Sequence, residues 1–166
     1  MQRTDFADMT CSIARTFDLA GEPWTPLILR DVYLGITRFD EMQRDLGISR
    51  KVLAGRLDRL VEHGVLERRT YSERPPRHDY VLTDKGGELV DVLLAAVAWG
   101  DRWEAGDAGP PVRIRHRDCG EITHAELHCA ECGEPMTHAD IEVLAGPGGS
   151  AGPGTRVVAE RLAAKV

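Results

Sequence analysis

Apolar residues recur every three or four positions through most of the first 105 residues, which is the spacing of one face of an α-helix. This pattern predicts helices over residues 11–20, 27–33, 38–46, 50–63 and 84–104. Glycines end most of these segments, at Gly21, Gly35, Gly47 and Gly64. Three hydroxyl residues precede segments in which their side chains could cap the first turn: Thr37, Ser49 and Thr83.

The period changes from helix to strand between the fourth and fifth of these segments. Residues 65–71 and 77–83 are short, and the second alternates apolar and polar side chains. The loop that joins them contains Glu73-Arg74-Pro75-Pro76-Arg77, in which two prolines stiffen the turn. We therefore expect a mainly helical domain that carries one β-hairpin.

Only Gly47-Ile48-Ser49 separates the third and fourth predicted helices, a connection typical of a helix-turn-helix. The second helix of such a motif places its N-terminal residues in the major groove of DNA. A basic hairpin directly after it forms a wing, whose arginines suit phosphates or the minor groove. The predicted fold class is a winged helix-turn-helix, mainly α with a small β wing. The candidate DNA contacts are Arg38, Ser49, Arg50, Lys51, Arg56, Arg74 and Arg77.

Ordered motifs along this region carry a resemblance to a known family. They are Cys11, Phe17-Asp18-Leu19-Ala20-Gly21-Glu22-Pro23-Trp24-Thr25, Leu27-Ile28-Leu29-Arg30-Asp31, Arg38-Phe39-Asp40-Glu41, Gly47-Ile48-Ser49, Val52-Leu53-Ala54-Gly55-Arg56-Leu57, Gly64-Val65-Leu66-Glu67-Arg68, Arg74-Pro75-Pro76-Arg77, Tyr80-Val81-Leu82-Thr83 and Trp99-Gly100. Together they resemble HxlR-type regulators, relatives of the MarR group, over about residues 9–104. Glu22-Pro23 departs from the usual Gly-Lys, and Gly55 from a common Ser.

The resemblance implies a homodimer formed through the first and last helices, with one recognition helix per protomer. Such a dimer reads a pseudo-palindromic site in double-stranded DNA. We expect a transcriptional regulator that acts as a repressor, tuned by a small-molecule effector or by thiol oxidation.

The charge distribution agrees with one directed DNA-binding surface. The whole chain carries 21 Lys and Arg against 27 Asp and Glu, a net charge of -6. Between Arg38 and Arg77 ten basic residues accompany seven acidic ones, a net +3 that leaves -9 for the remainder. A basic island on an acidic protein discourages indiscriminate binding to nucleic acid. Mixed charges that only solvate a surface are the alternative interpretation.

Cys11 is expected in the first turn of the first helix. Members of the HxlR type commonly carry a cysteine there, and in some of them it senses oxidants, quinones or aldehydes, so the resemblance implies a redox-sensing role for Cys11. A sensing thiol needs partial exposure and a helix N-terminus or a cation nearby, and Arg15 lies one turn away. The alternative is a small apolar residue at the dimer interface.

The composition changes at Gly106, where Gly-Asp-Ala-Gly-Pro-Pro marks a boundary. Beyond it, His116-Arg117-Asp118-Cys119-Gly120 and Cys129-Ala130-Glu131-Cys132-Gly133 repeat the pattern ligand-x-x-Cys-Gly, typical of a zinc knuckle. The predicted ligands of a structural Zn²⁺ are His116, Cys119, Cys129 and Cys132, and Asp118, His124 and His128 are alternatives to His116. The segment also resembles the zinc-ribbon tails of some actinobacterial HxlR-like regulators. Empty, reduced cysteines or a disulfide are the other interpretation.

These signals divide the chain into three parts. We expect a DNA-binding and dimerisation domain over residues 1–105, a small β zinc-ribbon-like module over 106–145, and a Gly/Pro linker with a tail over 146–166. An enzyme is not expected. His124-Ala125-Glu126 before Cys129 only superficially resembles the zinc-deaminase signature, because the spacer is too short, and no phosphate-binding or dinucleotide-binding loop occurs.

The same sequence predicts a cytoplasmic protein. No apolar run approaches the length that spans a bilayer, and the polar start Met1–Asp5 argues against a signal peptide. The cysteine spacing is not that of an extracellular disulfide framework. Two other functions compete with DNA regulation: a protein-interaction module in which the ribbon docks a partner, and a metal-responsive switch.

Overall fold

The computed structural model describes residue 6 and residues 8–164, and Met1–Asp5, on which the expectation of no signal peptide rests, lie outside that part. The body of the molecule contains α1 (Ser12–Ala20), α2 (Thr25–Tyr33), α3 (Phe39–Leu46), α4 (Arg50–Glu62), β1 (Leu66–Glu73), β2 (Pro76–Leu82) and α5 (Asp84–Trp103). The rest of the described chain, residues 106–164, is here called the arm. It contains β3 (Ile114–Arg115), β4 (Ile122–Thr123) and α6 (Arg156–Ala163).

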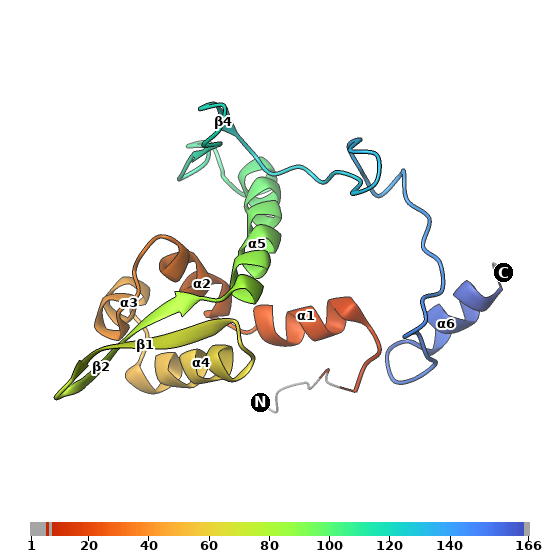
Figure 1. Cartoon of the computed structure of the whole chain (residues 1–166). Helices are drawn as coiled ribbons and strands as arrows, with labels where there is room; N and C mark the ends of the chain where they lie inside the picture. Colours follow the sequence, from red (N-terminus) through yellow and green to blue (C-terminus); the bar gives the residue numbers. More distant parts are fainter. Residues whose placement is uncertain (1–5, 7, 165–166) are drawn as a thin grey trace.

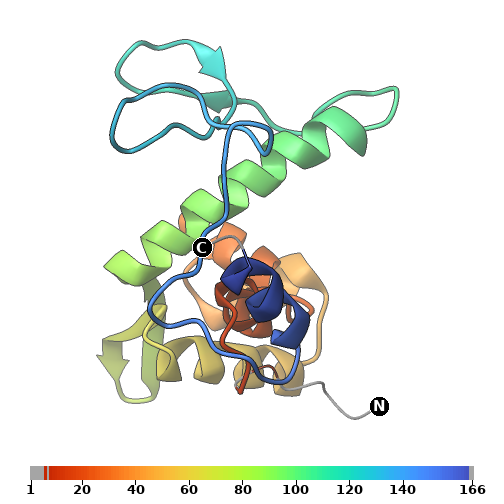
Figure 2. The same cartoon turned by 90° about the vertical axis from the view of Figure 1, so that its right-hand side faces the viewer.

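The body and the arm differ in how the chain is packed. Figure 1 shows α2, α3, α4 and the β1–β2 hairpin gathered together, with α5 rising from them. The arm leaves the far end of α5 and returns to the start of α1, so that α1, α5 and the arm describe a ring. Figure 2 shows from the side that the chain turns back after α5, so that the β3–β4 hairpin lies over the C-terminal half of that helix. The two-part organisation follows the composition change at Gly106.

The core of the body lies between α2, α3, α4 and the hairpin. Its buried residues come from positions one helical turn apart, so that each helix presents one apolar face. They are Ile28, Leu29, Val32, Met42, Ile48, Leu53, Leu57, Leu60, Val65, Leu66 and Tyr80. The helical spacing in the sequence therefore reflects burial against this common core.

Two of the three predicted helix caps form. The Ser49 hydroxyl accepts a hydrogen bond from the Val52 backbone N–H (3.3 Å), and the Thr83 hydroxyl accepts one from Gly86 N–H (3.1 Å). The prediction that Thr37 caps the third helix is wrong. Arg38 stands at that N-cap without a side-chain bond, and the Thr37 hydroxyl instead donates to Asp79 Oδ1 on β2 (2.9 Å).

The wing is an antiparallel hairpin tied to the helix-turn-helix. Its register runs from Leu66 opposite Leu82 to Glu73 opposite Pro76. The segment before α3 adds to its edge, because the Tyr80 backbone N–H donates to Thr37 O (2.9 Å) and Arg38 forms a bridge with Asp79. Because of these bonds, the wing and the start of α3 form one unit.

Close backbone packing fixes the start of α5 against the wing. A Cβ at Gly86 would lie 2.2 Å from the carbonyl oxygen of Val65, whereas one at Gly87 would meet no atom within 4 Å. A side chain at position 86 is therefore incompatible with this approach. The glycine lets α5 begin directly on the hairpin.

The end of the arm is attached to the segment before α1. The Thr10 hydroxyl donates to Ser150 O (3.1 Å), and the Ser150 hydroxyl donates back to Thr10 Oγ1 (3.3 Å). Thr155 is buried and its hydroxyl also donates to Ser150 O (2.9 Å). We call these three residues the clasp. Residues 146–154 contain no helix or strand, and α6 follows them, where the sequence supported no specific prediction.

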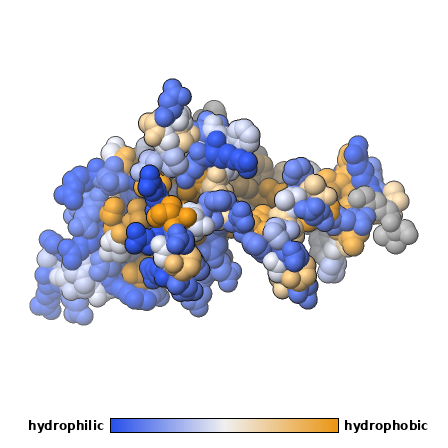
Figure 3. Space-filling model, turned by 90° about the horizontal axis from the view of Figure 1, so that it is seen from above, coloured by the Kyte–Doolittle hydropathy of each residue, from blue (hydrophilic) through white to orange (hydrophobic). Residues whose placement is uncertain are grey.

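The face of the molecule seen from above is mostly hydrophilic (Figure 3). Figure 3, a view from above, shows apolar colour over the middle of the molecule and at the end that carries α6. Among the residues that the structure describes, no helix combines the length and the hydropathy needed to cross a bilayer.

Candidate nucleic-acid interface

The start of α4 presents two exposed cations, Arg50 and Lys51, beside the Ser49 cap. Arg50 Nη1 lies 3.1 Å from Asp40 Oδ1 and 3.3 Å from Gln43 Oε1, and its guanidinium stacks 4.8 Å from the centre of the Phe39 ring. These contacts orient Arg50 along α3 while its side chain remains 69% exposed. A cation held in place at a helix N-terminus, where backbone N–H groups are free, is suited to bind a phosphate.

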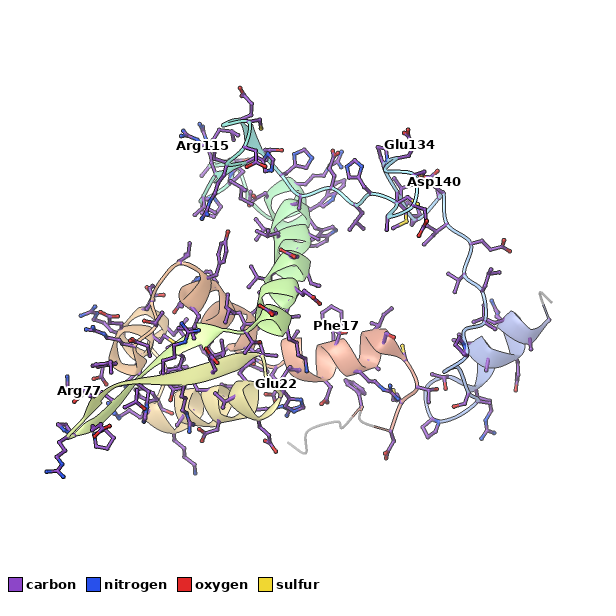
Figure 4. All side chains as sticks on the ribbon, viewed as in Figure 1. Phe17, Glu22, Arg77, Arg115, Glu134 and Asp140 are labelled. Atoms are coloured by element: carbon purple, nitrogen blue, oxygen red, sulfur yellow. The ribbon has the colours of Figure 1, made fainter. Side chains whose placement is uncertain are left out.

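The tip of the wing carries Arg74 and Arg77, both exposed. Figure 4 shows Arg77 near the tip of the hairpin. The Ser72 hydroxyl donates to Pro75 O (3.1 Å) and closes the turn. The rigid turn thus places two cations beyond the edge of the body.

A hollow of about 490 Å³ lies between the wing and the start of α3 and α4. Its walls include Arg38, Arg50, Tyr71 and Arg77. The Arg38 guanidinium lies 5.0 Å from the centre of the Tyr71 ring and 3.8 Å from Asp79 Oδ1. The fold therefore brings three of the predicted DNA contacts, Arg38, Arg50 and Arg77, around one concave surface, although they come from three different parts of the chain.

Arg56 faces a different part of the molecule. Its Nε donates to Pro23 O (3.0 Å), and its Nη1 lies 3.4 Å from Glu22 Oε2. Its side chain is only 27% exposed. The side chain of Arg56, a predicted DNA contact, thus binds the connection between α1 and α2.

Arg59, which the sequence did not single out, joins the same cluster. Its Nη2 lies 2.7 Å from Asp18 Oδ2, and its Nη1 lies 3.1 Å from Glu22 Oε1. All three side chains are largely buried, and a buried charge is costly without an opposite charge beside it. The cluster connects the recognition helix to the end of α1. Its members lie 37 and 41 residues apart, which no local pattern reveals.

A second buried carboxylate lies on α2. Asp31 is fully buried, and its Oδ1 accepts a hydrogen bond from Arg30 Nε (2.9 Å). Its Oδ2 has no hydrogen-bond partner among the described residues. Burial raises the pKa of the Asp31 carboxyl above its ordinary value of 3.8, and the bond from Arg30 opposes that shift. Its burial was not predicted from the sequence, because an aspartate in a helix is usually exposed.

Cys11 precedes α1, at its N-cap, and is partly buried. The Arg15 backbone N–H donates to Cys11 O (3.0 Å). The Arg15 side chain is directed elsewhere, since its Nε donates to Met9 O (2.9 Å). The cation predicted to assist the thiol is therefore engaged with the backbone.

The two Cys-Gly motifs of the arm fold into closely similar loops. In the first, Gly120 N–H donates to His116 O (2.9 Å) and His116 N–H to Glu121 O (3.0 Å). In the second, Gly133 N–H donates to Cys129 O (2.9 Å) and Cys129 N–H to Glu134 O (2.9 Å). Both glycines have positive φ, 74° and 76°. Hydrogen bonds from the backbone of Cys132 and Glu131 lower the pKa of the Cys129 thiol, which favours the thiolate.

These loops, here called the first and second knuckles, are not brought together. His116 Nδ1 lies 3.4 Å from Cys119 Sγ within the first knuckle. Across the described part of the chain, no group of three or more metal-binding side chains is assembled. The predicted closed ribbon is therefore not seen, and the module is a two-stranded sheet followed by a separate loop. The alternative ligands have other contacts: His128 Nδ1 lies 2.9 Å from Gly133 O, and His124 Nε2 lies 3.2 Å from Glu126 Oε1.

A groove of about 790 Å³ lies where the end of α5 meets the β3–β4 hairpin. Trp99, Trp103, Val112 and Ile122 give it apolar walls, and these side chains are all more than half exposed. Polar groups, among them Arg102 and His124, also line it. Such a groove suits an apolar ligand or an apolar protein surface.

Comparison with known proteins places this geometry in a family. The HxlR-like helix-turn-helix family matches residues 19–107. The HTH-type transcriptional regulator Rv3095 of Mycobacterium tuberculosis is 42% identical over 137 residues, which cover 82% of this chain and 87% of that protein. The transcriptional regulator YodB of Bacillus subtilis is 38% identical over 93 residues, 55% of this chain and 83% of that protein.

Two solved structures extend the likeness into the arm. PA1607, a candidate transcription factor, matches with a TM-score of 0.73 at 35% identity, over 84% of this chain and 98% of its own. PA1374 of Pseudomonas aeruginosa, also a candidate transcription factor, matches with a TM-score of 0.60 at 38% identity, over 94% of this chain and 100% of its own. Residues 1–107 alone could not supply such coverage. The chain belongs to the HxlR-like helix-turn-helix family and is a transcriptional regulator, not an enzyme.

Proposed function

We propose that this regulator is a homodimer that binds double-stranded DNA through α4 and the wing and represses transcription from a pseudo-palindromic operator. The observation that carries the proposal is the position of its exposed cations. Lys51 stands at the start of α4, and Arg74 and Arg77 stand at the tip of the wing. A recognition helix in the major groove would bring the wing arginines to the adjacent backbone.

Unpartnered apolar side chains on α1 and α5 support the homodimer. Ile13 and Phe17 lie one turn apart on α1 and are 70% and 56% exposed. Val92, Trp99 and Trp103 recur at helical spacing on α5 and are also exposed. Large apolar faces of this kind are normally covered by a partner. In a two-fold dimer the recognition helices would lie about 34–36 Å apart, one turn of DNA.

The DNA-binding proposal is tested with a library of random duplexes about 30 base pairs long, long enough for two half-sites. Selection and sequencing should recover a pseudo-palindrome. On that duplex, Arg50→Ala or Lys51→Ala should cost about 1–3 kcal/mol of binding free energy. Arg74→Ala should reduce the slope of log affinity against log salt by about 1.

The matched control is Arg161→Ala, which removes an exposed cation from α6. It should leave both affinity and salt slope unchanged. Operator affinity that is unaltered in all three variants would contradict the proposed DNA face. Selection of unrelated sequences would contradict specific recognition.

The signal that tunes DNA binding is proposed to act at Cys11 or at the groove beside α5. Among similar structures are the reduced form of YodB (36% identity, TM-score 0.51) and the redox regulator HypR in its reduced form (27% identity, TM-score 0.51). Cys11 is partly exposed at the N-cap of α1, so an oxidant or electrophile can reach it. A small apolar effector would instead fit the groove lined by Trp103 and Val112.

Thiol labelling separates these two routes. Iodoacetamide should modify Cys11 in the folded protein, and Cys11→Ser should keep operator affinity while losing its response to oxidant. An unreactive Cys11 would contradict the redox route. A response that survives in Cys11→Ser but is lost when Ala98→Trp fills the groove would assign the signal to the groove.

We further propose that His116, Cys119, Cys129 and Cys132 hold one structural Zn²⁺. One nitrogen and three sulfur donors make a tetrahedral set that this metal prefers. The knuckle loops support the fit, since each has the backbone turn that brings its two ligands to one side. The ion would join the two knuckles and stabilise the arm. Native mass spectrometry should find one zinc per chain, and release of DNA on chelation would make the site a metal-responsive switch.

A further inference from the structure

The arm has almost no core of its own. Among its described residues only Thr155 is buried. Most of its large apolar side chains are half or more exposed: Val112, Ile122, Leu127, Ile141, Val143, Leu144, Val157 and Val158. A segment that buries so little cannot offset the conformational entropy lost on ordering. Something outside the segment must therefore supply contacts.

The arm is also divided by charge. Residues 112–123, the basic half, contain Arg113, Arg115 and Arg117 against Asp118 and Glu121, a net charge of +1, and the arginines lie on the strand that leads into the first knuckle. Residues 124–145, which include the second knuckle, contain five acids and no Lys or Arg. The two halves are complementary. Figure 4 nevertheless shows Arg115 on one side of the ring and Glu134 and Asp140 on the other.

The arrangement of the metal-binding residues follows the same division. His116 and Cys119 lie on the basic half, and Cys129 and Cys132 lie on the acidic half, each pair in a preformed knuckle. The basic half is held by its position at the end of α5, where Ile114 and Ile122 share a groove with Trp103. The far end of the arm is held by the clasp at Thr10. Both ends of the arm thus contact the body while the knuckles between them stay apart.

We propose that a second copy of this chain completes the arm: the arginine-rich strand and first knuckle of one protomer meet the acidic second knuckle of its partner, and each zinc is bound between the two chains. The inference rests on the dimer and the zinc site proposed above. Two-fold symmetry makes the contact occur twice, so one dimer holds two complete sites. The apolar residues of α1, α5 and the arm border one ring and are covered together.

The competing arrangement is closure within one chain, and mixing two full-length variants distinguishes them. The first variant, His116→Ala/Cys119→Ser, has lost its first knuckle, and the second, Cys129→Ser/Cys132→Ser, has lost its second. Neither alone can form a complete site. If zinc is bound between chains, a heterodimer has one intact first knuckle facing one intact second knuckle and binds one zinc. If zinc is bound within a chain, the heterodimer binds none.

Native mass spectrometry of the wild type, each variant and the refolded mixture, titrated with Zn²⁺ alone, reads out all of these states. We expect two zinc ions per wild-type dimer, none in either variant and one in the heterodimer. A zinc-free heterodimer beside a zinc-loaded wild type overturns the inference in favour of closure within one chain. A wild-type protein that binds no zinc, or binds it as a monomer, overturns it as well. Operator binding, measured in parallel, reports independently on the proposed DNA function.

A charge exchange tests the same contact without touching the cysteines. Arg113→Glu/Arg115→Glu and Glu131→Arg/Glu134→Arg each place like charges at both symmetric contacts, so each homodimer should dissociate about tenfold more readily at low salt. Mixing the two should restore wild-type dimer affinity, because one contact is native and the other is reversed on both sides. Sedimentation equilibrium measures the dissociation constants. Homodimers that remain as stable as wild type would overturn the proposed contact.

Discussion

Arg59 on the recognition helix and Asp18 on α1 form an ion pair with Nη2 2.7 Å from Oδ2, and both side chains are largely buried. The same guanidinium reaches Glu22 in the connection between α1 and α2. The helix that is proposed to read DNA is therefore joined by charge to the helix that is proposed to dimerise. A displacement of α1 would be transmitted to α4 through this pair, because both partners need one another.

Removing Arg59 should be costly for stability. Arg59→Ala leaves Asp18 and Glu22 without the guanidinium that lies between them, and breaking a buried pair typically costs about 3 kcal/mol of unfolding free energy. Urea unfolding at fixed protein concentration measures the loss. Arg44→Ala, at an exposed position on α3, should change stability by less than about 0.5 kcal/mol. Equal effects of the two substitutions would show that the cluster adds nothing.

Two adjacent glycines at the start of α5 should respond oppositely to the same substitution. Gly86→Ala places a methyl group 2.2 Å from Val65 O, so α5 must move away from the wing at a cost of about 1–3 kcal/mol. Gly87→Ala meets open space and should stabilise the helix by about 0.5 kcal/mol. Thermal unfolding of both variants measures the two changes in stability. A stable Gly86→Ala would mean that the approach of α5 to the wing is loose.

Asp31 should make stability depend on pH in an unusual direction. Because burial raises the pKa of its carboxyl, the folded chain holds the proton more tightly than the unfolded chain does. Its contribution to stability is thus fully present below the ordinary pKa of 3.8 and is lost as pH rises through the higher folded-state pKa. The unfolding free energy of the wild type, relative to Asp31→Asn, should therefore fall with rising pH.

Urea unfolding of the wild type and Asp31→Asn across the acidic to neutral range measures that difference. Asp107→Asn, at an exposed position in the arm, is the control and should give a difference independent of pH. A wild-type advantage that grows with pH would contradict the raised pKa. It would instead indicate that Arg30 controls the carboxyl.

Asp40 should weaken DNA binding in the wild type. It is 82% exposed and pairs with Arg50 at the start of α4, where it competes with phosphate and repels it. Asp40→Asn should raise affinity for any duplex several-fold at low salt, and the gain should shrink as salt increases. Fluorescence anisotropy against two unrelated duplexes measures both effects. A loss of affinity would mean that Asp40 orients Arg50 for binding.

The sequence predicted those parts of the body that depend on neighbouring residues. Ser49 and Thr83 cap their helices because the bonds they make reach only three residues along the chain. Thr37 was misassigned because its hydroxyl bonds to Asp79, 42 residues away. The cluster of Arg59 with Asp18 and Glu22 was missed for the same reason. Partners at such separations become visible only once the chain is folded.

In the arm, too, the sequence predicted features that depend on nearby residues and not those that depend on distant ones. The pattern ligand-x-x-Cys-Gly predicted the shape of each knuckle, since Gly120 and Gly133 supply the positive φ that the turn needs. The same pattern does not indicate whether the two knuckles lie close together in the folded protein. That depends on the path of the chain between them, and the structure keeps the two apart. The zinc site consequently stays a prediction.

The clasp has a consequence for how such a protein can change over evolutionary time. Thr10 and Ser150 lie on either side of residues 19–107, the stretch that matches the HxlR-like family, and yet they contact each other. The segments on either side of that stretch therefore form one accessory unit rather than two. Substitutions before α1 and in the tail should be inherited in pairs, and transplanting the accessory to another family member would require both ends at once.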